Sequence, residues 1–123
     1  MTKPQPVLTY ASVVTRESVR IALLIAALND MSVLGADISN AYLNAPTTEK
    51  VWTILGAEWG SDAGKKAIIV RALYGLKSSG AAYRNHLASY LRSLGFRSCL
   101  ADPDVWYRIA KRSEGEEFYE YLL

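Results

Sequence analysis

The sequence predicts an α+β fold in which an antiparallel sheet packs on two main helices. Two helix-like segments, 16–29 and 79–94, alternate with short apolar runs that are typical of strands. The last two runs, 104–110 and 117–123, are joined by the short polar loop 111–116. This spacing predicts an antiparallel hairpin, so α+β is favoured over a doubly wound parallel sheet.

The composition indicates one ordinary globular domain. The chain has 123 residues, half of them hydrophobic, and a formal net charge of +2, so it has enough apolar material for a core and is not a disordered segment. This mildly basic charge permits nucleic acid as a partner without requiring it. One cysteine and one histidine exclude an internal disulfide and give too few ligands for a His/Cys zinc site.

The same sequence predicts an intracellular protein, cytoplasmic or nuclear, that is neither secreted nor bound to a membrane. The N-terminus lacks the apolar core of a secretory signal. The longest apolar run, 19–31, is shorter than the roughly 20 residues that cross a bilayer.

The first third of the chain predicts a lead-in, a helix and a strand. Residues 1–14 contain two prolines and are expected to be extended. Thr15 can cap a helix over 16–29, with Glu17 in the first turn, where acids suit the helix dipole. This helix is apolar nearly all round, so we expect other structure to cover it. The run 32–38, "SVLGADI", predicts a short buried strand.

The middle of the chain predicts a turn and two more strands. Residues 39–44 form a brief turn or helix, which Pro46 stops. The apolar runs 51–55 and 67–74 predict strands, and the Gly, Ser and Asp of 58–66 predict an exposed loop between them.

The clearest helix follows. Ser79 is a plausible cap and Gly95 ends the helix. His86 lies away from the apolar stripe and is expected to be solvated. The stripe has the i, i+4, i+7, i+8, i+11 spacing of one helical face: Tyr83, Leu87, Tyr90, Leu91 and Leu94.

Few residues stand out chemically, and each has an ordinary alternative. Asp37 follows an apolar run, so it can be a surface cap or a metal-binding acid, and Tyr42 can be a core aromatic or part of a site. Asp102 and Asp104 could pair on a metal, but an Asp-Pro-Asp turn more often bonds nearby backbone N–H groups. Three tryptophans could stack on bases but are expected to fill the core or cover a sheet edge: Trp52, Trp59 and Trp106.

Three motifs in order carry a family resemblance. They are "DISNAYLN" at 37–44, "ALYGLK" at 72–77 and "ADPDVW" at 101–106, followed by the apolar strand 118–123. The chain from about residue 9 onward resembles the reverse transcriptase of copia-type retrotransposons. There the pattern is D-x-x-x-A-[FY]-L-N, then A-L-Y-G-L-K, then A-D-P-x-x-[WY], then an apolar strand that enters Tyr-Val-Asp-Asp. The resemblance implies that residues 15–123 form a partial fingers–palm region, truncated before the second catalytic acid motif.

The resemblance also implies a metal and nucleotide site. Asp37 would be the first metal-binding acid of the palm, with the backbone carbonyl of Ile38 as a supplementary ligand for Mg²⁺ or Mn²⁺. The backbone N–H groups of Ser39, Asn40 and Ala41 would contact the triphosphate. Tyr42 would be a steric gate, a ring under the sugar that excludes a 2′-OH.

A second segment would complete the nucleotide pocket. Tyr74, Gly75 and Lys77 would surround it, with Leu76 and Ser79 nearby. Gly75 would allow a close approach of the backbone to the template or nucleotide, although a simple turn also explains it. Lys77 can equally be a solvated lysine. The sequence has "SSGA" at 78–81 where many family members have Gln-Ser-Pro-Arg, which leaves the template contact of that Arg without a counterpart.

The implied function is template-directed DNA synthesis from dNTPs by two-metal phosphoryl transfer. Its partners would be an RNA or DNA template-primer, a dNTP and the remainder of the polymerase chain. This chain alone is expected to be inactive, to bind no metal tightly, and either to self-associate or to be only marginally stable. The alternative is a non-catalytic module that binds nucleic acid or a protein. An in-frame Tyr-Val-Asp-Asp downstream would support the first interpretation, and a stop codon the second.

Overall fold

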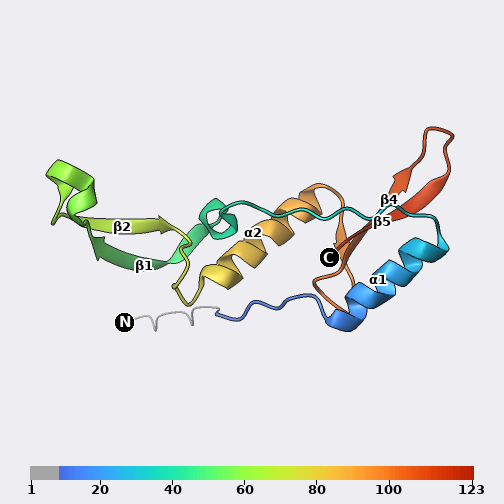
Figure 1. Ribbon diagram of the computed structural model, residues 1–123, viewed down its shortest axis with the longest axis horizontal. Coiled ribbons are helices and arrows are strands. Elements are labelled where there is room, and N and C mark those ends of the chain that lie inside the picture. Colours follow the sequence, from blue (N-terminus) through green and yellow to red (C-terminus); the bar gives the residue numbers. More distant parts are fainter. Residues whose placement is uncertain (1–8) are drawn as a thin grey trace, which may run out of the picture. The chain divides into compact units, whose positions relative to one another are not determined.

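A computed structural model describes residues 9–123 as two compact units (Figure 1). Unit 1 contains residues 9–11 and 38–87, and unit 2 contains residues 12–37 and 88–123. Residues 9–14 have no regular secondary structure. The first eight residues of the predicted lead-in lie outside the described residues.

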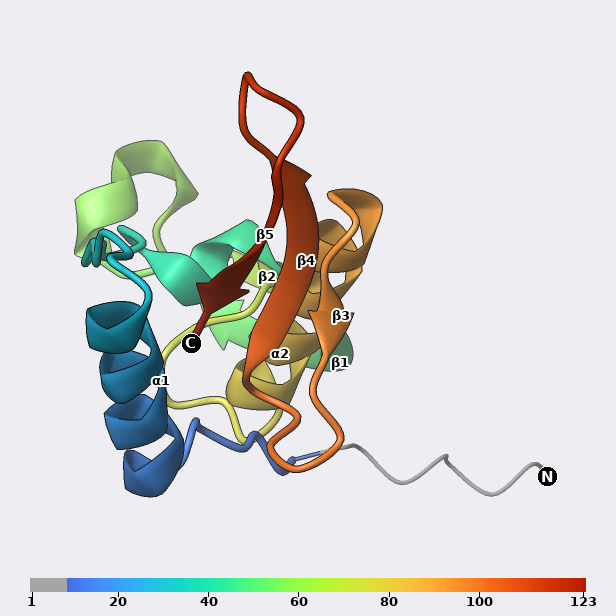
Figure 2. The ribbon, with the colours of Figure 1, turned by 90° about the vertical axis from the view of Figure 1, so that its right-hand side faces the viewer.

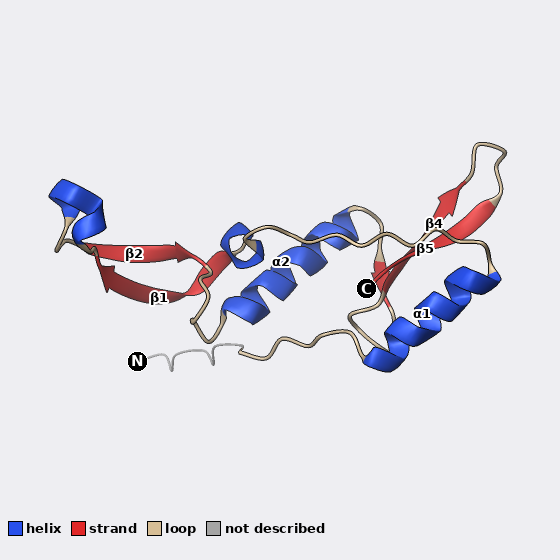
Figure 3. Ribbon diagram, in the orientation of Figure 1, coloured by secondary structure: helices blue, strands red, loops and turns tan. Residues whose placement is uncertain are grey.

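Unit 1 is built on an antiparallel hairpin. Strand β1 (Pro46–Ile54) pairs with β2 (Lys66–Arg71), and Val51 lies opposite Ile69. The connection contains the short 3₁₀ helix η2 (Ala57–Asp62), and both strands and loop are seen in Figure 3. The two predicted strands are confirmed, but β1 begins earlier, at a proline, which a strand tolerates as its first residue. Strand β2 ends at Arg71 rather than continuing to residue 74.

Helix α2 (Ser79–Ser93) begins in unit 1, but Ser79 is its first helical residue and not its cap. The Ser79 hydroxyl donates to the Leu73 carbonyl, and the Ser78 N–H donates to Glu49 Oε1 at 3.0 Å. A carboxylate from β1 therefore takes the role that a serine was expected to play. A residue of a strand can bond to the start of a helix in this way because any nearby acceptor satisfies an unpaired N–H.

The core of unit 1 is made of small residues. Ala45 and Ala72 are completely buried, and Ala82 of α2 packs with them. The expected apolar stripe of α2 is only partly covered, since Tyr90 remains 61% exposed. Ala82 of α2 packs against the alanines that flank the hairpin, so the buried face of α2 differs from the one that large residues predict.

Unit 2 begins with helix α1 (Arg16–Leu28), whose start is as predicted. The Thr15 hydroxyl oxygen accepts the Ser18 N–H at 3.2 Å and caps the helix. The expectation that other structure covers this helix is wrong for the described residues: Ile21 and Leu24 are both 58% exposed, and Ala26 is its buried residue. None of the described helices has the length and apolar character needed to span a membrane.

The sheet of unit 2 has the order β3-β4-β5 and is antiparallel (Figure 2). Strands β4 (Trp106–Lys111) and β5 (Glu117–Leu122) form the predicted hairpin. Strand β3 (Arg97–Ser98) has two residues, too few to leave a pattern in the sequence. The described residues thus contain two separate antiparallel sheets rather than the single sheet expected, and the α+β class is confirmed.

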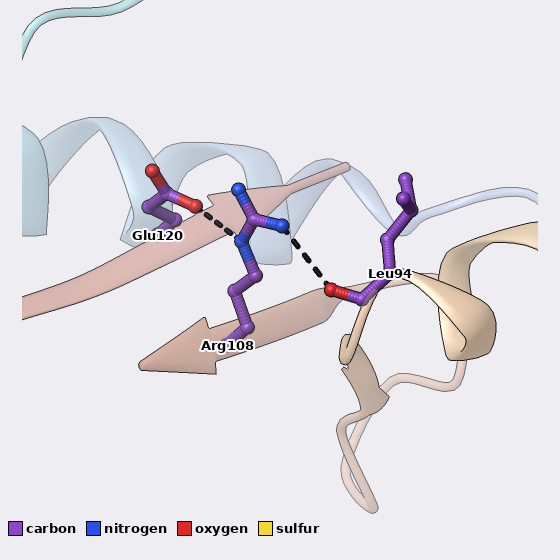
Figure 4. Close-up of polar contacts among 3 residues, drawn as sticks. All are labelled: Leu94, Arg108 and Glu120. Carbon is purple, nitrogen blue, oxygen red and sulfur yellow. Dashed lines mark hydrogen bonds and ion pairs between the residues drawn. The ribbon is translucent and has the colours of Figure 1, made fainter. Parts of the chain in front are cut away.

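The end of α2 is joined to this sheet through polar contacts. Gly95, with φ +85°, follows the helix, and the N–H groups of Gly95 and Phe96 donate to the carbonyls of Arg92 and Leu91. This is the Schellman pattern that a glycine at this position favours. Arg108 of β4 then donates to Glu120 of β5 and, at 3.1 Å, to the Leu94 carbonyl (Figure 4).

The predicted strand 32–38 is absent: the structure has no regular secondary structure at 31–38. Leu34 is 93% exposed and Val33 is 62% exposed. The strand ladders of the described residues are β1–β2, β3–β4 and β4–β5, and this segment joins none of them. An apolar run predicts that a segment can lie in a sheet, but a strand also needs a partner for its N–H and C=O groups.

Candidate functional site

Asp37 and Ile38 lie at the end of this irregular segment. Asp37 is exposed and is the last residue of the first stretch of unit 2, whereas Ile38 begins the second stretch of unit 1 and is 49% exposed. Within the described residues Asp37 has no hydrogen bond or ion pair, so its carboxylate oxygens are available to a ligand. No group of three or more His, Cys, Asp or Glu residues that could hold a metal is found in residues 9–123. The described chain therefore offers one acid at this position, not an assembled metal site.

The residues after Ile38 form a tight turn. Asn40 has a left-handed conformation, with φ 51° and ψ 41°, and its carbonyl accepts the Leu43 N–H at 2.9 Å. The 3₁₀ helix η1 (Ala41–Asn44) follows, which confirms the predicted brief helix. The Asn44 side-chain amide donates to the carbonyl oxygens of residues 39–41, at 3.3–3.5 Å. These bonds fix the turn that carries Tyr42.

Tyr42 is the centre of a cluster of three tyrosine rings. Its ring stacks on that of Tyr74, with centroids 4.4 Å apart and planes 26° apart. The ring of Tyr83, from the first turns of α2, lies 5.9 Å away at 48°. Tyr42 is half-buried whereas Tyr74 is 72% exposed. The structure thus brings together two predicted site residues from motifs that are far apart in the sequence.

A backbone contact explains how these motifs meet. The Ala72 N–H donates to the Ala45 carbonyl at 3.0 Å, and both alanines are completely buried. Larger side chains would separate the two segments. Ala45 lies three residues after Tyr42, and Ala72 lies two residues before Tyr74. The contact between these two alanines therefore brings the two tyrosines together.

Gly75 occupies a turn that favours glycine. Its φ is +97°, and the next N–H, that of Leu76, donates to the Leu73 carbonyl at 3.3 Å. A Cβ at Gly75 would meet no heavy atom within 4 Å. The open space agrees with a simple turn and also leaves the backbone accessible.

Gly75→Ala should therefore lower the free energy of unfolding through backbone strain alone, by roughly 1–3 kcal/mol. Urea denaturation followed by circular dichroism measures it. Gly35→Ala is the matched control, because a Cβ there also meets open space and the backbone φ is not positive. If both variants lowered the free energy of unfolding by the same amount, backbone strain at Gly75 would not be the cause.

Lys77 is exposed, and within the described residues it makes no hydrogen bond or ion pair with Tyr42 or Tyr74. The residues that sequence reasoning did not assign to the site are Tyr83 and Gly80. The helical spacing of the sequence did identify Tyr83, but only as the first residue of the apolar stripe of α2. Gly80 lies against Tyr42, since a Cβ there would be 3.6 Å from the Tyr42 hydroxyl. A single glycine in a helix gave no signal of this approach.

Asp102 is structural, as expected. Its Oδ2 accepts the Thr15 N–H at 3.0 Å and the Ser18 hydroxyl at 2.6 Å, and its Oδ1 accepts the Asp104 N–H at 3.1 Å. The hydrogen bond from Ser18, followed by that from the Thr15 backbone, lowers the pKa of Asp102 from 3.8 to about 2. The carboxylate joins the start of α1 to the turn before β4.

This lowered pKa predicts how stability depends on pH. The unfolded chain binds the proton near the ordinary pKa of 3.8 and the folded chain only near 2, so the contribution of Asp102 is complete above 3.8 and is lost as the pH falls toward 2. Asp102→Asn should reduce the free energy of unfolding at neutral pH and weaken its decrease between pH 3.8 and about pH 2. Urea midpoints measured across this range test it. Asp62 forms an exposed ion pair with Lys65, and Asp62→Asn should leave the pH dependence of the free energy of unfolding unchanged.

The aromatic and histidine predictions have mixed outcomes. Trp106 is buried, as expected, with the Arg92 guanidinium 5.4 Å from the ring centroid. Trp52 and Trp59 do not fill the core, since they are 54% and 58% exposed, and their covering of a sheet edge stays a prediction. Both lie in or beside the β1–β2 hairpin, whose two strands leave much of their surface uncovered. His86 is exposed, as predicted.

Comparison with known proteins agrees with the motifs. The family model described as reverse transcriptase (RNA-dependent DNA polymerase) matches residues 6–114. The chain is 28% identical over 117 residues to the retrovirus-related Pol polyprotein from transposon TNT 1-94 of Nicotiana tabacum. This match covers 93% of the chain and 8% of the polyprotein, so the chain spans a small part of that relative.

No solved structure matches the chain. The family match covers far more than half of the sequence, and it falls on the motifs that contain Tyr42 and Tyr74. The predicted resemblance to copia-type retrotransposon enzymes is confirmed, and the chain belongs to the reverse transcriptase family.

Proposed function

We propose that this chain acts as the fingers–palm part of a reverse transcriptase, which copies an RNA or DNA template into DNA from dNTPs inside the cell. The observation that carries the proposal is the stack of Tyr42 on Tyr74. The two motifs that contain them are implied to surround one nucleotide, and their rings lie in contact. A tyrosine pair formed only to fill a core would be buried, whereas Tyr74 is largely exposed.

Tyr42 suits the role of a steric gate. Its ring is half-buried and lies near two other rings, those of Tyr74 and Tyr83, and these contacts would oppose its rotation. A gate selects by clash: a 2′-OH that meets the ring raises the energy of the bound ribonucleotide, whereas a deoxynucleotide fits. No attractive contact to the sugar is needed.

Asp37 would supply one carboxylate to a divalent cation, with the Ile38 carbonyl beside it. Mg²⁺ is commonly held by one or two carboxylates together with substrate phosphates and water. An exposed acid without a partner in the described residues fits one ligand of such a site. It does not fit a whole two-metal site, so the other acids would have to come from the remainder of the polymerase, and the 123 residues alone are proposed to be inactive.

The remaining residues would contact the substrate. The turn of Ser39, Asn40 and Ala41 would face the triphosphate, and Gly75 would let the template or nucleotide approach the backbone. Lys77, exposed just before α2, would contact phosphate. Such contacts release counterions, so we expect nucleic-acid affinity to fall as salt rises.

A chimera tests the proposal without assuming what adjoins this chain. Residues 1–123 would replace the matching segment of the tobacco transposon polyprotein, and primer extension would be assayed with Mg²⁺ and with Mn²⁺. Extension by the chimera, and none by the isolated chain, is expected. An inactive chimera beside an active parent protein would contradict the proposal.

One observation favours the alternative, a non-catalytic binding module. Strand β5 is an edge strand in the described sheet, and Tyr119 and Tyr121 on it are 49% and 40% exposed. Such an edge can pair with another strand. If the chimera is inactive while the isolated chain forms dimers in light scattering, or binds nucleic acid, this alternative is favoured.

A further inference from the structure

We infer that Tyr74 and Tyr83 are positioning residues that hold the ring of Tyr42, so that the choice between deoxynucleotides and ribonucleotides depends on all three tyrosines. The inference rests on the proposed function, because it concerns the gate assigned there to Tyr42. It adds that the gate is a cluster of rings rather than a single residue.

The ring geometry is the first support. The Tyr42–Tyr74 pair, with 4.4 Å between centroids and 26° between planes, is a stacked arrangement, and the Tyr42–Tyr83 pair is tilted at 48°. Stacked and tilted contacts at these separations are attractive for aromatic rings. Tyr42 is therefore restrained by two different rings, of which Tyr74 makes the closer contact.

The second support is that the backbones of both neighbours are held by hydrogen bonds that do not involve the Tyr42 side chain. Tyr74 follows Ala72, whose N–H bonds to the Ala45 carbonyl, and the Ser79 hydroxyl bonds to the Leu73 carbonyl. Tyr83 lies on α2, whose start is held by Glu49 through the Ser78 N–H. Each neighbour thus has its own anchor, and Tyr42 is the ring that these anchors orient.

Gly80 lies close to the hydroxyl end of the Tyr42 ring. A Cβ built at Gly80 would lie 3.6 Å from the Tyr42 hydroxyl, so the end of the ring reaches the backbone of α2 where this residue has no side chain. The ring therefore has neighbours on its stacked face, on the side of Tyr83 and at its hydroxyl end.

A gate of this kind works only if the ring stays in place. When a 2′-OH meets a ring that can rotate, the ring turns away and the ribonucleotide binds. When the neighbours oppose that rotation, the clash remains and selectivity is kept. Loss of Tyr74 should therefore affect ribonucleotides more than deoxynucleotides, whose sugar leaves the ring undisturbed.

Tyr74 also offers a clean test, because 72% of it is exposed and its removal leaves no core cavity. In the chimera, kcat/KM is measured for dCTP and for CTP. Tyr74→Ala should reduce the ratio of kcat/KM for dCTP to kcat/KM for CTP by roughly threefold to tenfold. This factor corresponds to the free energy of one aromatic pair contact. Tyr74→Phe, which keeps the ring, should retain the ratio. Tyr90→Ala removes a tyrosine that is 61% exposed on α2 and is the matched control.

Tyr42→Ala separates the two levels of the proposal. If it lowers the ratio but Tyr74→Ala does not, the positioning role is overturned and the gate remains. If Tyr42→Ala leaves the ratio unchanged, the gate itself fails. A general loss of folding would lower both kcat/KM values without changing their ratio.

A measurement on the 123-residue chain tests the contact independently of activity. The chain would be labelled with 3-fluorotyrosine, and the ¹⁹F resonance of Tyr42 would be assigned from its loss in Tyr42→Phe. Tyr74→Ala and Tyr83→Leu should each shift this resonance, because a neighbouring ring current is removed, and Tyr90→Ala should not. An unmoved Tyr42 resonance in Tyr74→Ala overturns the inference whether or not the chimera polymerises.

Discussion

Asp37→Asn is expected to reduce primer extension by the chimera by roughly a hundredfold to a thousandfold, the loss that removal of one key electrostatic group in an active site produces. Asparagine has the same shape but no charge, so it neither neutralises a divalent cation nor binds it strongly. Asp37 has no hydrogen bond or ion pair within the described residues, so the substitution should leave the fold intact.

Asp30→Asn is the matched control for this substitution. Asp30 is also an exposed acid before the first motif, and its φ of 50° is one that asparagine readily adopts. Its variant should extend primers at the parent rate, and both variants should have the parent circular dichroism spectrum. Retention of full activity by Asp37→Asn, with either Mg²⁺ or Mn²⁺, would remove Asp37 from the proposed site.

Trp106→Ala should lower the free energy of unfolding by about 3–5 kcal/mol, the usual cost of removing a large buried aromatic. Trp106 is 6% exposed in the central strand of its sheet, opposite Ser98 on one side and Leu122 on the other. The Arg92 guanidinium near its ring adds a cation–π contact. A small domain has about 5–15 kcal/mol of stability in total, so the variant should be close to unfolding.

Urea denaturation followed by circular dichroism measures this loss. Trp59→Ala removes the same side chain from a position that is 58% exposed and should change the stability by less than about 0.5 kcal/mol. Equal losses of stability in the two tryptophan variants would show that burial does not explain the role of Trp106.

The sequence predicted the elements whose causes are local. Thr15 caps α1 because its hydroxyl needs only the N–H three residues on, and the β4–β5 hairpin needs only a short polar loop between two apolar runs. Asp102 likewise bonds the N–H of Asp104 within its own turn. Its further bonds to the start of α1 had no local signal.

The failures share a different cause, which is dependence on distant partners. Residues 32–38 have a strand-like pattern but no partner in the described ladders, and Ser79 lost its expected capping role to Glu49, a residue of β1. At the candidate site, the motifs indicated Tyr42 and Tyr74, and the structure places them in contact. Tyr83 was overlooked because a helix-face tyrosine is ordinary until its neighbour is known. The roles of Asp37 and of the residues at 38–41 remain predictions.

The hydrogen bond from Thr15 to Asp102 joins residues 87 positions apart, and unit 2 is built from two stretches that flank most of unit 1. A ribosome therefore delivers α1 early but the turn that anchors it late. Unit 1 has all of its residues by position 87 and can fold while synthesis continues. During that interval the start of α1 lacks the Asp102 carboxylate that accepts the Thr15 N–H and the Ser18 hydroxyl, so α1 should be less stable until residue 102 emerges from the ribosome.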